Sequence, residues 1–338
     1  MPYKLCMVGC GWFANHQYGP AIRQLIAQHA EWEFSACCDV VEQKARAFAE
    51  AFAARRTYTD LLAMCREEKP DVVLMAVPSG VMFEAALRVL QEGVPLLLEK
   101  PPGLTLEQWA SLEAVAVRDR VPNQVAFNRR HMPALGRARA VLEEKFTQAH
   151  ISRISYTMLR CGRLNEDFST TAIHALDTLL FLGGSPFTEA QFRFGPVERG
   201  QPVRITLDAV AQSGIRSHLD ILPDAGRSVE MISVDAAGQT LEIRLAATPE
   251  ADLQGEVDYW RRGVRHAVYS DAASPVHSRS GVYNEIAAFC AVVASATGRP
   301  APTLSECGQQ VALMEAIRSR RTDRLVWDSD ARRLVSVE

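Results

Sequence analysis

The chain has 338 residues, of which 48% are hydrophobic and 23% are charged, and its formal net charge is -3. This composition is typical of a globular protein and excludes disordered, collagen-like and repeat-built chains. Nucleic-acid and anionic-membrane partners normally require a basic excess, so the charge predicts neither and favours a small-molecule partner. The length leaves room for two domains, each with its own core.

The N-terminal residues enter a strand pattern almost directly, without the basic segment, apolar run and small-residue cleavage site of a secretory signal. No apolar run approaches the roughly 18 residues that a membrane span requires. We therefore predict a cytoplasmic protein without a membrane span. The eight cysteines include no C-x-x-C pair, which predicts buried, reduced thiols and no metal site.

Short apolar runs alternate with amphipathic stretches up to residue 127, a pattern typical of strands joined by crossover helices in a doubly wound parallel sheet. The expected strands are Lys4–Val8, Glu33–Cys38, Val72–Ala76, Pro95–Leu98 and Gln124–Phe127. The expected helices are Ala21–His29, Gln43–Ala53, Thr59–Glu67, Val81–Glu92 and Thr105–Val117, the last capped by the Thr105 hydroxyl. Residues 1–127 are therefore predicted to form one α/β domain.

Beyond residue 150 the pattern changes to one helix followed by alternating strands, which predicts a mainly antiparallel sheet. The expected strands are Ile151–Leu159, Glu189–Phe194, Val203–Val210, Arg216–Leu222, Arg227–Ser233 and Thr240–Ala246. Hairpin turns are expected at Asp224–Gly226 and Ala236–Gly238, and closing helices at Gly281–Ala296 and Leu304–Arg320. Residues 128–338 are thus predicted to form a second, α+β domain with an open sheet.

The turn after the first expected strand reads Gly9-Cys10-Gly11-Trp12-Phe13-Ala14. Gly9 permits a tight turn, Gly11 lets backbone amides approach a pyrophosphate, and Ala14 allows the next helix to pack closely on the strand. A turn that merely connects a strand to a helix is the alternative. Because a strand precedes it and a helix follows, we predict a cofactor site that includes Gly9, Gly11, Trp12, Phe13 and Ala14.

The second expected strand ends in Asp39, whose carboxylate can accept hydrogen bonds from both hydroxyls of an adenosine ribose. It would repel the 2′-phosphate of NADP, and Val40-Val41 add no cation to bind that group. We therefore predict NAD in preference to NADP, with Lys44 and Arg46 farther along, on the expected solvated face of the next helix. The 28 residues from Gly11 to Asp39 also predict an extended first helix or loop.

Three further motifs follow in order: Glu99-Lys100-Pro101, Asn128-Arg129-Arg130 and His174-Ala175-Leu176-Asp177. Together with the glycine turn and Asp39, they resemble the glucose-fructose oxidoreductase, inositol dehydrogenase and MocA (Gfo/Idh/MocA) family. The resemblance is dense in the N-terminal half and thin beyond it, and Glu-Lys-Pro is its specific part. It implies a Rossmann domain followed by an open antiparallel sheet that binds the substrate.

The resemblance implies that Lys100 stands beside the reacting carbon, where its ammonium would bind the substrate oxygen; a surface lysine at a strand end is the alternative. It also implies contacts of Pro78, Glu99, Lys100 and Asn128 with the cofactor, with orientation of Lys100 as the alternative role for Glu99. His174 is the candidate general acid and base, because imidazole titrates near neutral pH. A hydrogen-bonded core histidine is the alternative for His174.

Two positions depart from the family pattern. Where the family often has Asp-x-x-x-His, this chain has Thr170, which can hydrogen-bond a substrate hydroxyl but cannot carry a proton at neutral pH. Met82 stands where the family often has a histidine. Glu166 and Asp167 are candidates for the missing carboxylate. The departures predict an altered or more apolar pocket, or reduced dehydrogenase competence.

Further candidates for the substrate site are Arg129, Arg160 and Asp177. Arg129 and Arg130 could each hold a carboxylate or phosphate with two hydrogen bonds, although an ordinary ion pair is expected for at least one of them. Arg160 ends a strand that leads to the His174 helix, and Asp177 could steady His174 or cap a neighbouring element. The cationic stretch Trp260–His266 is expected to be a solvated loop or a subunit contact rather than an anion site.

The leading hypothesis is an NAD(P)-dependent oxidoreductase that interconverts a secondary alcohol and a ketone on a sugar, cyclitol or related polyol; the polyol comes from the resemblance alone. One alternative is a glycoside hydrolase or lyase that uses NAD for transient oxidation. A non-catalytic regulator that binds the dinucleotide is the other. Because an open sheet must be covered, we expect a homo-oligomer, a dimer or tetramer, formed through the C-terminal sheet.

Overall fold

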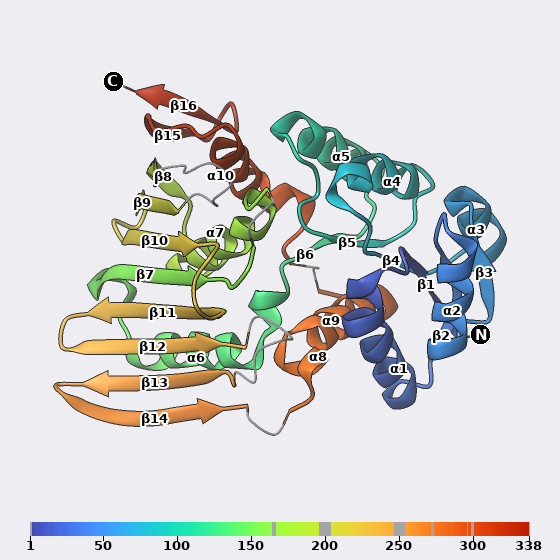
Figure 1. The fold of residues 1–338 in the computed structure, drawn as a ribbon, viewed down its shortest axis with the longest axis horizontal. Coiled ribbons are helices and arrows are strands. Elements are labelled where there is room, and N and C mark those ends of the chain that lie inside the picture. The colour runs from blue at the N-terminus through green and yellow to red at the C-terminus, as the bar shows by residue number, and fades with distance from the viewer. Residues whose placement is uncertain are drawn as a thin grey trace. The chain divides into compact units, whose positions relative to one another are not determined.

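A computed structural model describes residues 2–163, 167–195, 204–246, 254–271, 274–295, 297–298 and 301–337. The contacts divide the chain into two compact units (Figure 1). The first comprises Met1–Asn128 and Gly281–Val311, and the second Arg129–Ser280 and Ala312–Glu338. The boundary expected after residue 127 lies beside the first division, whereas Gly281–Val311, expected in the second domain, packs in the first unit.

The first unit contains a six-stranded sheet in the order β3-β2-β1-β4-β5-β6, with all neighbours parallel. Its strands are β1 (Tyr3–Val8), β2 (Trp32–Cys38), β3 (Arg56–Tyr58), β4 (Val72–Met75), β5 (Leu96–Glu99) and β6 (Asn123–Ala126). This confirms the predicted Rossmann-type sheet. The strand order reverses between β1 and β4, and ligands of such sheets bind at the carboxyl ends of the strands beside this point.

The helices of the first unit include one element that the sequence did not predict. They are η1 (Ala14–Tyr18), α1 (Gly19–Gln28), α2 (Glu42–Phe52), α3 (Leu61–Glu68), α4 (Ser79–Gln91), α5 (Leu106–Arg118), α9 (Val282–Ser295) and η4 (Leu304–Glu306). The unpredicted element is η1, a π-helix that runs directly into α1 and accounts for the long interval before Asp39. Thr105 caps α5 as predicted, because its side chain accepts a hydrogen bond from the Gln108 amide at 3.2 Å.

The second unit contains a ten-stranded sheet in the order β14-β13-β12-β11-β7-β10-β9-β8-β15-β16. Its strands are β7 (Ile151–Leu159), β8 (Phe187–Phe194), β9 (Ile205–Ala211), β10 (Arg216–Leu222), β11 (Val229–Ala236), β12 (Gln239–Leu245), β13 (Glu256–Arg261), β14 (Val264–Ser270), β15 (Arg324–Asp328) and β16 (Arg333–Val337). Among the described strands only β7 and β10 pair in parallel, which confirms a mainly antiparallel sheet.

The other helical segments are η2 (Asn128–His131), α6 (Pro133–Lys145), η3 (Gln148–His150), α7 (Ser169–Gly183), α8 (Val276–Arg279) and α10 (Gly308–Arg318). α6 and α7 pack on one face of the ten-stranded sheet, and apolar side chains from every second strand position meet them there. No described helix is long and apolar enough to cross a membrane.

The two predicted hairpin turns had different outcomes. Ala237 and Gly238 connect the antiparallel strands β11 and β12, and Gly238 has a φ of +69°, as such a turn requires. The hairpin expected at Asp224–Gly226 is wrong, because β10 and β11 both pair with β7, which lies between them. Turn residues predict a reversal of the chain but not the partner of the next strand. Trp260–His266, expected as a loop, belongs to the β13–β14 hairpin.

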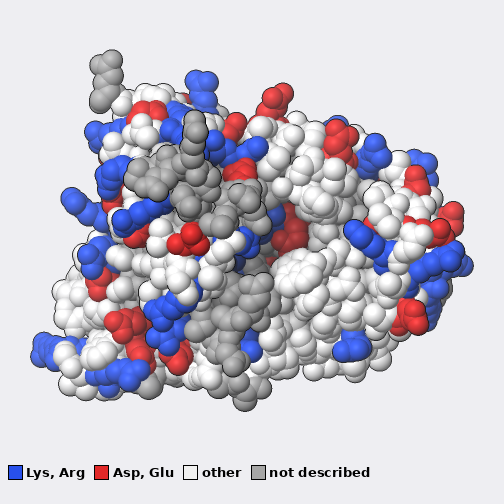
Figure 2. Space-filling model, in the orientation of Figure 1, with Lys and Arg blue, Asp and Glu red and all other residues white. Residues whose placement is uncertain are grey.

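The face of the ten-stranded sheet opposite α6 and α7 carries rows of cross-strand ion pairs. They include Arg153 with Asp235 at 2.8 Å, Arg204 with Asp220 at 2.7 Å and Arg244 with Glu256 at 2.8 Å. Figure 2 shows acidic and basic side chains interspersed over the strands of this unit. This face is therefore polar and charge-balanced rather than apolar.

Candidate functional site

The glycine turn, Asp39, Pro78 and Lys100 all follow strands of the parallel sheet and so lie at its carboxyl edge. The Gly9 amide donates to the carbonyl oxygen of Cys38 at 2.8 Å, which joins the turn to the end of β2. A Cβ on Gly9 would lie 2.2 Å from the carbonyl oxygen of Ala76, in the segment that leads to Pro78, the N-cap of α4. The first unit therefore brings these predicted residues together.

The glycine turn has room for a dinucleotide. Gly9 has a φ of +87°, whereas a Cβ on Gly11 would meet no atom within 4 Å and points into open space. The Asn15 side-chain amide donates to the carbonyl oxygens of Cys10 and Gly11 at 3.0 and 2.8 Å and so fixes the turn. Ala14 is buried as predicted. A fixed turn with open space before a helix fits a pyrophosphate.

Two aromatic residues of the turn lie in different surroundings. Trp12 is 56% exposed, and its ring stacks on that of His16 with 4.3 Å between the centroids. Phe13 is half-buried and packs edge-on against Tyr18 at 5.9 Å. Trp12 therefore leaves a flat aromatic surface open to solvent beside the turn, while Phe13 faces the protein.

Asp39 ties the second strand to the glycine turn. Its Oδ2 accepts a hydrogen bond from the Cys10 amide at 2.8 Å, and its Oδ1 accepts one from the Val41 amide at 2.9 Å. Val40 is 88% exposed, and Arg46 is paired with Glu42 at 2.5 Å. The carboxylate is thus held at the end of β2, where a ribose would lie in a sheet of this type.

Lys100 directly follows β5, and the carboxylate before it has a buried partner. The Tyr18 hydroxyl donates to Oε1 of Glu99 at 2.9 Å, and Tyr18 is completely buried. Burial, together with the negative charges of Glu99 and Glu285, raises the pKa of Tyr18 well above its ordinary value, so the phenol remains a donor. The Lys100–Pro101 peptide bond is cis. The sequence did not predict the contribution of Tyr18.

The predicted site residues Thr170, His174 and Asp177 all lie on α7. His174 is 8% exposed, and Asp177 is fully buried. Arg130 holds Asp177 with two hydrogen bonds, at 2.9 Å from Nε and 2.6 Å from Nη2. Asp177 therefore forms an internal ion pair with Arg130. An ordinary ion pair was the expectation for at least one of Arg129 and Arg130.

Thr170 lies one turn before His174 on the same helix. Its hydroxyl donates to the carbonyl oxygen of Asp167 at 3.2 Å, and the Asp167 carboxylate pairs with Arg318 at 2.7 Å. Asp167 thus has a structural partner of its own, and Glu166, the other candidate for the missing carboxylate, lies outside the described residues.

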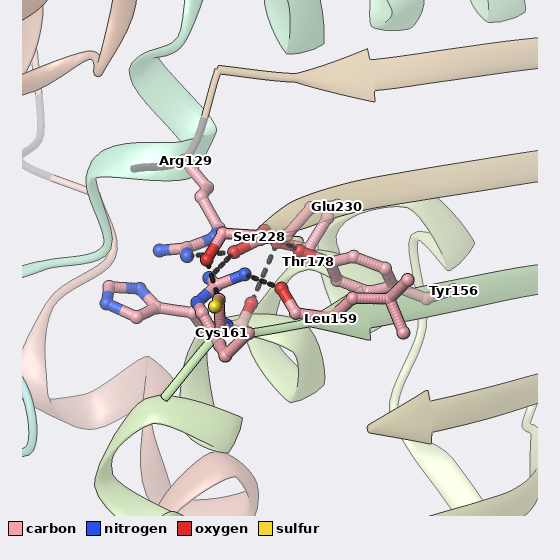
Figure 3. Close-up of polar contacts among 9 residues, drawn as sticks. Arg129, Tyr156, Leu159, Cys161, Thr178, Ser228 and Glu230 are labelled. Atoms are coloured by element: carbon pink, nitrogen blue, oxygen red, sulfur yellow. Dashed lines mark hydrogen bonds and ion pairs between the residues drawn. The ribbon is translucent and has the colours of Figure 1, made fainter. Parts of the chain in front are cut away.

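Arg129 and Arg160 meet in a buried cluster around Glu230, at the amino end of β11 (Figure 3). Arg129 Nε donates to Glu230 at 2.7 Å, and Tyr156 and Arg160 also donate to this carboxylate. Burial alone would raise the pKa of Glu230, but the two guanidinium groups hold it well below its ordinary value. Sequence reasoning missed Glu230, although a carboxylate within the apolar run Val229–Val234 was a possible signal.

The cysteines are all free thiols, and all but Cys161 are buried. Burial raises the pKa of Cys38 to about 12 and that of Cys65 to about 11, so both are poor nucleophiles. Among the described residues no group of three or more histidines, cysteines or carboxylates is placed to hold a metal ion. The candidate chemistry therefore rests on the glycine turn, Lys100 and the α7 region.

We expect the two glycines of the turn to respond differently to alanine. Gly9→Ala would force a positive φ and a clash with the Ala76 carbonyl, and should lower the free energy of unfolding by roughly 2–3 kcal/mol. Gly11→Ala, the matched control, should unfold like the wild type but bind NADH about tenfold more weakly, because its methyl group enters the open space. Urea unfolding and NADH fluorescence titration measure both effects. Equal stability of the two variants would contradict this.

Comparison with known proteins shows that the chain is similar to oxidoreductases. Residues 3–127 match the model of the Gfo/Idh/MocA oxidoreductase family, described by its NAD-binding Rossmann fold. The chain is 28% identical over 259 residues to a D-apiose dehydrogenase of Paraburkholderia graminis. The aligned region covers 71% of this chain and 67% of that protein. The chain is 26% identical over 201 residues to a D-glucoside 3-dehydrogenase of Escherichia coli, which covers 55% of each.

A solved structure shares the fold over nearly the whole chain. It is a dehydrogenase from Chromobacterium violaceum, superposed with a TM-score of 0.81 at 18% identity and covering 94% of each chain. The parallel sheet of the first unit and the mainly antiparallel sheet of the second agree with this shared fold. Residues 3–127 thus match the Gfo/Idh/MocA oxidoreductase family, and over more of its length the chain is similar to proteins named dehydrogenases.

Proposed function

We propose that the protein is an NAD-dependent dehydrogenase that interconverts a secondary alcohol and a ketone on a sugar, cyclitol or related polyol. The observation that carries this proposal is Lys100, which follows β5 at the same sheet edge as the glycine turn. Two relatives named D-apiose dehydrogenase and D-glucoside 3-dehydrogenase support a sugar-related substrate.

The residues have separate roles in this proposal. The glycine turn and Asp39 would hold NAD, which would supply the acceptor for hydride from the carbinol carbon or, as NADH, the donor for its return to the ketone. The Lys100 ammonium donates a hydrogen bond to the substrate oxygen and stabilises negative charge that develops on it. Tyr18 fixes the adjacent Glu99, and His174 takes the hydroxyl proton and returns it in the reverse direction.

Other predicted contacts complete the proposal. Gly9, Gly11, Trp12, Pro78 and Asn128 are proposed to contact the cofactor. Arg129, Arg160 and Thr170 are proposed to line the substrate site, whereas Asp177 is proposed to act through its ion pair with Arg130. A homo-oligomer formed through the charge-paired face of the ten-stranded sheet stays a prediction.

The cofactor preference gives a direct test. We expect NADH to bind at least about tenfold more tightly than NADPH, because the Asp39 carboxylate would repel a 2′-phosphate. The double variant Asp39→Ser with Val40→Arg should reverse this preference, since Val40 is 88% exposed and an arginine there would not disturb the core. Fluorescence titration with both cofactors is the measurement. Tighter binding of NADPH to the wild type would refute the role given to Asp39.

Activity is tested with a panel of sugars, cyclitols and alditols, each offered with NAD⁺ while absorbance at 340 nm is followed. Net formation of NADH on at least one substrate is the expected result. Glycosidic substrates belong in the same panel, because cleavage without net NADH would favour transient oxidation instead. NADH binding without turnover of any compound would favour the regulatory alternative.

A further inference from the structure

The cluster around Glu230 contains more positive than negative charge. It comprises Arg129 of η2, Tyr156 of β7, Arg160, which directly follows β7, and Glu230 of β11 (Figure 3). The side chains of Arg129 and Arg160 are only 5% exposed, and that of Glu230 is fully buried. Two guanidinium groups therefore share one carboxylate in a site almost without solvent.

The charge imbalance is fixed by the chemistry of the groups. Arginine does not lose its proton in proteins, and Glu230 is ionised because its pKa is held low. Burial and the neighbouring Glu230 raise the pKa of Tyr156 well above its ordinary value, so it contributes no charge. The cluster therefore carries a net charge of about +1 in a buried place, where an unbalanced charge is costly.

Two donor nitrogens of the cluster make no hydrogen bond to the carboxylates and carbonyl groups of the described residues. Arg129 uses Nε and Nη2 on Glu230, and Arg160 uses Nη2 on Glu230 and Nη1 on the Leu159 carbonyl oxygen. Nη1 of Arg129 and Nε of Arg160 make no further hydrogen bond to a described carboxylate or carbonyl group, although the Tyr156 hydroxyl lies close enough to Arg129 to help raise the pKa of its guanidinium. Each guanidinium thus retains a hydrogen-bond direction for an anionic group from outside.

The cluster lies in the same unit as His174. α7, which carries His174, packs on β7, the strand that supplies Tyr156 and ends beside Arg160. The Thr178 hydroxyl, one turn after His174, donates to the His174 carbonyl oxygen at 2.8 Å and holds this part of the helix. An anion bound by the cluster would therefore be bound by the unit that carries the proposed acid-base residue.

We propose that Arg129 and Arg160, positioned by Glu230, bind a carboxylate of the substrate, so that the substrate is a polyhydroxy acid such as an aldonate or uronate. This deepens the proposed dehydrogenase function and rests on it. A planar carboxylate matches guanidinium donors and the single excess charge, whereas a phosphate monoester carries -1.5 to -2 near neutral pH. The anion is thus a carboxylate rather than a phosphate.

The test compares acids with neutral compounds of the same carbon skeleton: gluconate with glucitol, galactonate with galactitol, and glucuronate with glucose. Calorimetric titration of the wild-type protein, with and without NADH, should show at least one acid binding about tenfold more tightly than its neutral partner at low salt. With NAD⁺, the same acid should have the higher kcat/KM. No preference for any acid, or tighter binding of glucose 6-phosphate, would overturn the proposal.

Variants assign the preference to the cluster. Arg129→Gln and Arg160→Gln should each abolish the preference for the acid, while Arg153→Gln, on the same strand as Tyr156 but paired with Asp235 at 2.8 Å, should retain it. Cooperative unfolding and unchanged NADH binding show that a variant is folded. If a variant does not fold, the wild-type comparison still decides.

The experiments distinguish failure of the proposed carboxylate site from failure of the proposed dehydrogenase function. Oxidation of neutral polyols without any response to acids refutes only the carboxylate site. Lack of NADH binding refutes the dehydrogenase function, whatever the acids do.

Discussion

Lys100→Met is expected to lower kcat/KM on a sugar or polyol substrate by about 100- to 1,000-fold while NADH binding stays within about twofold of the wild type. The substitution removes the ammonium that would hydrogen-bond the substrate oxygen, and a preorganised donor of this kind contributes several kcal/mol to transition-state stabilisation. Methionine has a similar length, so the backbone after β5 should not change. Steady-state kinetics and NADH titration separate the two effects.

Two comparison variants sharpen this experiment. Lys145→Met, which removes a lysine paired with Glu144 at 2.8 Å in the second unit, should leave kcat/KM unchanged. Tyr18→Phe should reduce kcat by a smaller factor than Lys100→Met, because it removes only the donor to Glu99. Full activity of the Lys100→Met protein would show that another group binds the substrate oxygen.

Glu230→Gln should cost about 3–5 kcal/mol in the free energy of unfolding. The substitution leaves the buried guanidinium groups of Arg129 and Arg160 without a negative partner, and breaking one side of a buried ion pair has a cost of this size. The matched control is Glu256→Gln on the same sheet, whose partner Arg244 is exposed, and it should cost less than about 1 kcal/mol. Urea unfolding at neutral pH measures both.

The difference in free energy of unfolding between the wild type and Glu230→Gln should depend on pH in a definite direction. The native pKa of Glu230 lies below its ordinary value of 4.5, so the carboxylate stabilises the fold at every pH above that value. As the pH falls below about 4.5 the unfolded chain takes up the proton first, and the stabilisation decreases towards the lowered native pKa. The difference between wild type and Glu230→Gln should therefore shrink in acid. A constant difference from pH 7 to pH 3 would show that ionisation of Glu230 does not stabilise the fold.

The glycine turn and the cap of α5 were predictable because each depends on residues close together in the chain. Gly9 and Gly11 follow a strand, and Thr105 accepts a hydrogen bond from an amide three residues later. The ends of β7 and β10 were also predicted correctly from alternating apolar residues. The short, polar strand β3 gave no such alternation and was missed.

The sheet order of the second unit could not be read from turns. Gly226 follows β10 as a hairpin turn would, yet the next strand pairs with β7. A turn limits the local path of the chain, whereas strand pairing depends on which apolar faces can be buried together. For the same reason α9, which the sequence order placed with the second domain, packs its apolar side chains Val282, Ile286 and Phe289 in the core of the first unit.

The sequence by itself determined the two sheet types, the glycine turn and the position of Asp39 after the second strand, since periodicity and local backbone demands express these features directly. The role proposed for Lys100 came from the family resemblance. Only the tertiary structure decided the partners of the buried charges. Tyr18 meets Glu99 across 81 positions, Arg130 meets Asp177 across 47, and Arg129 meets Glu230 across 101. Such pairs depend on which strands and helices lie side by side, so a charged residue's role was open until its neighbours were known.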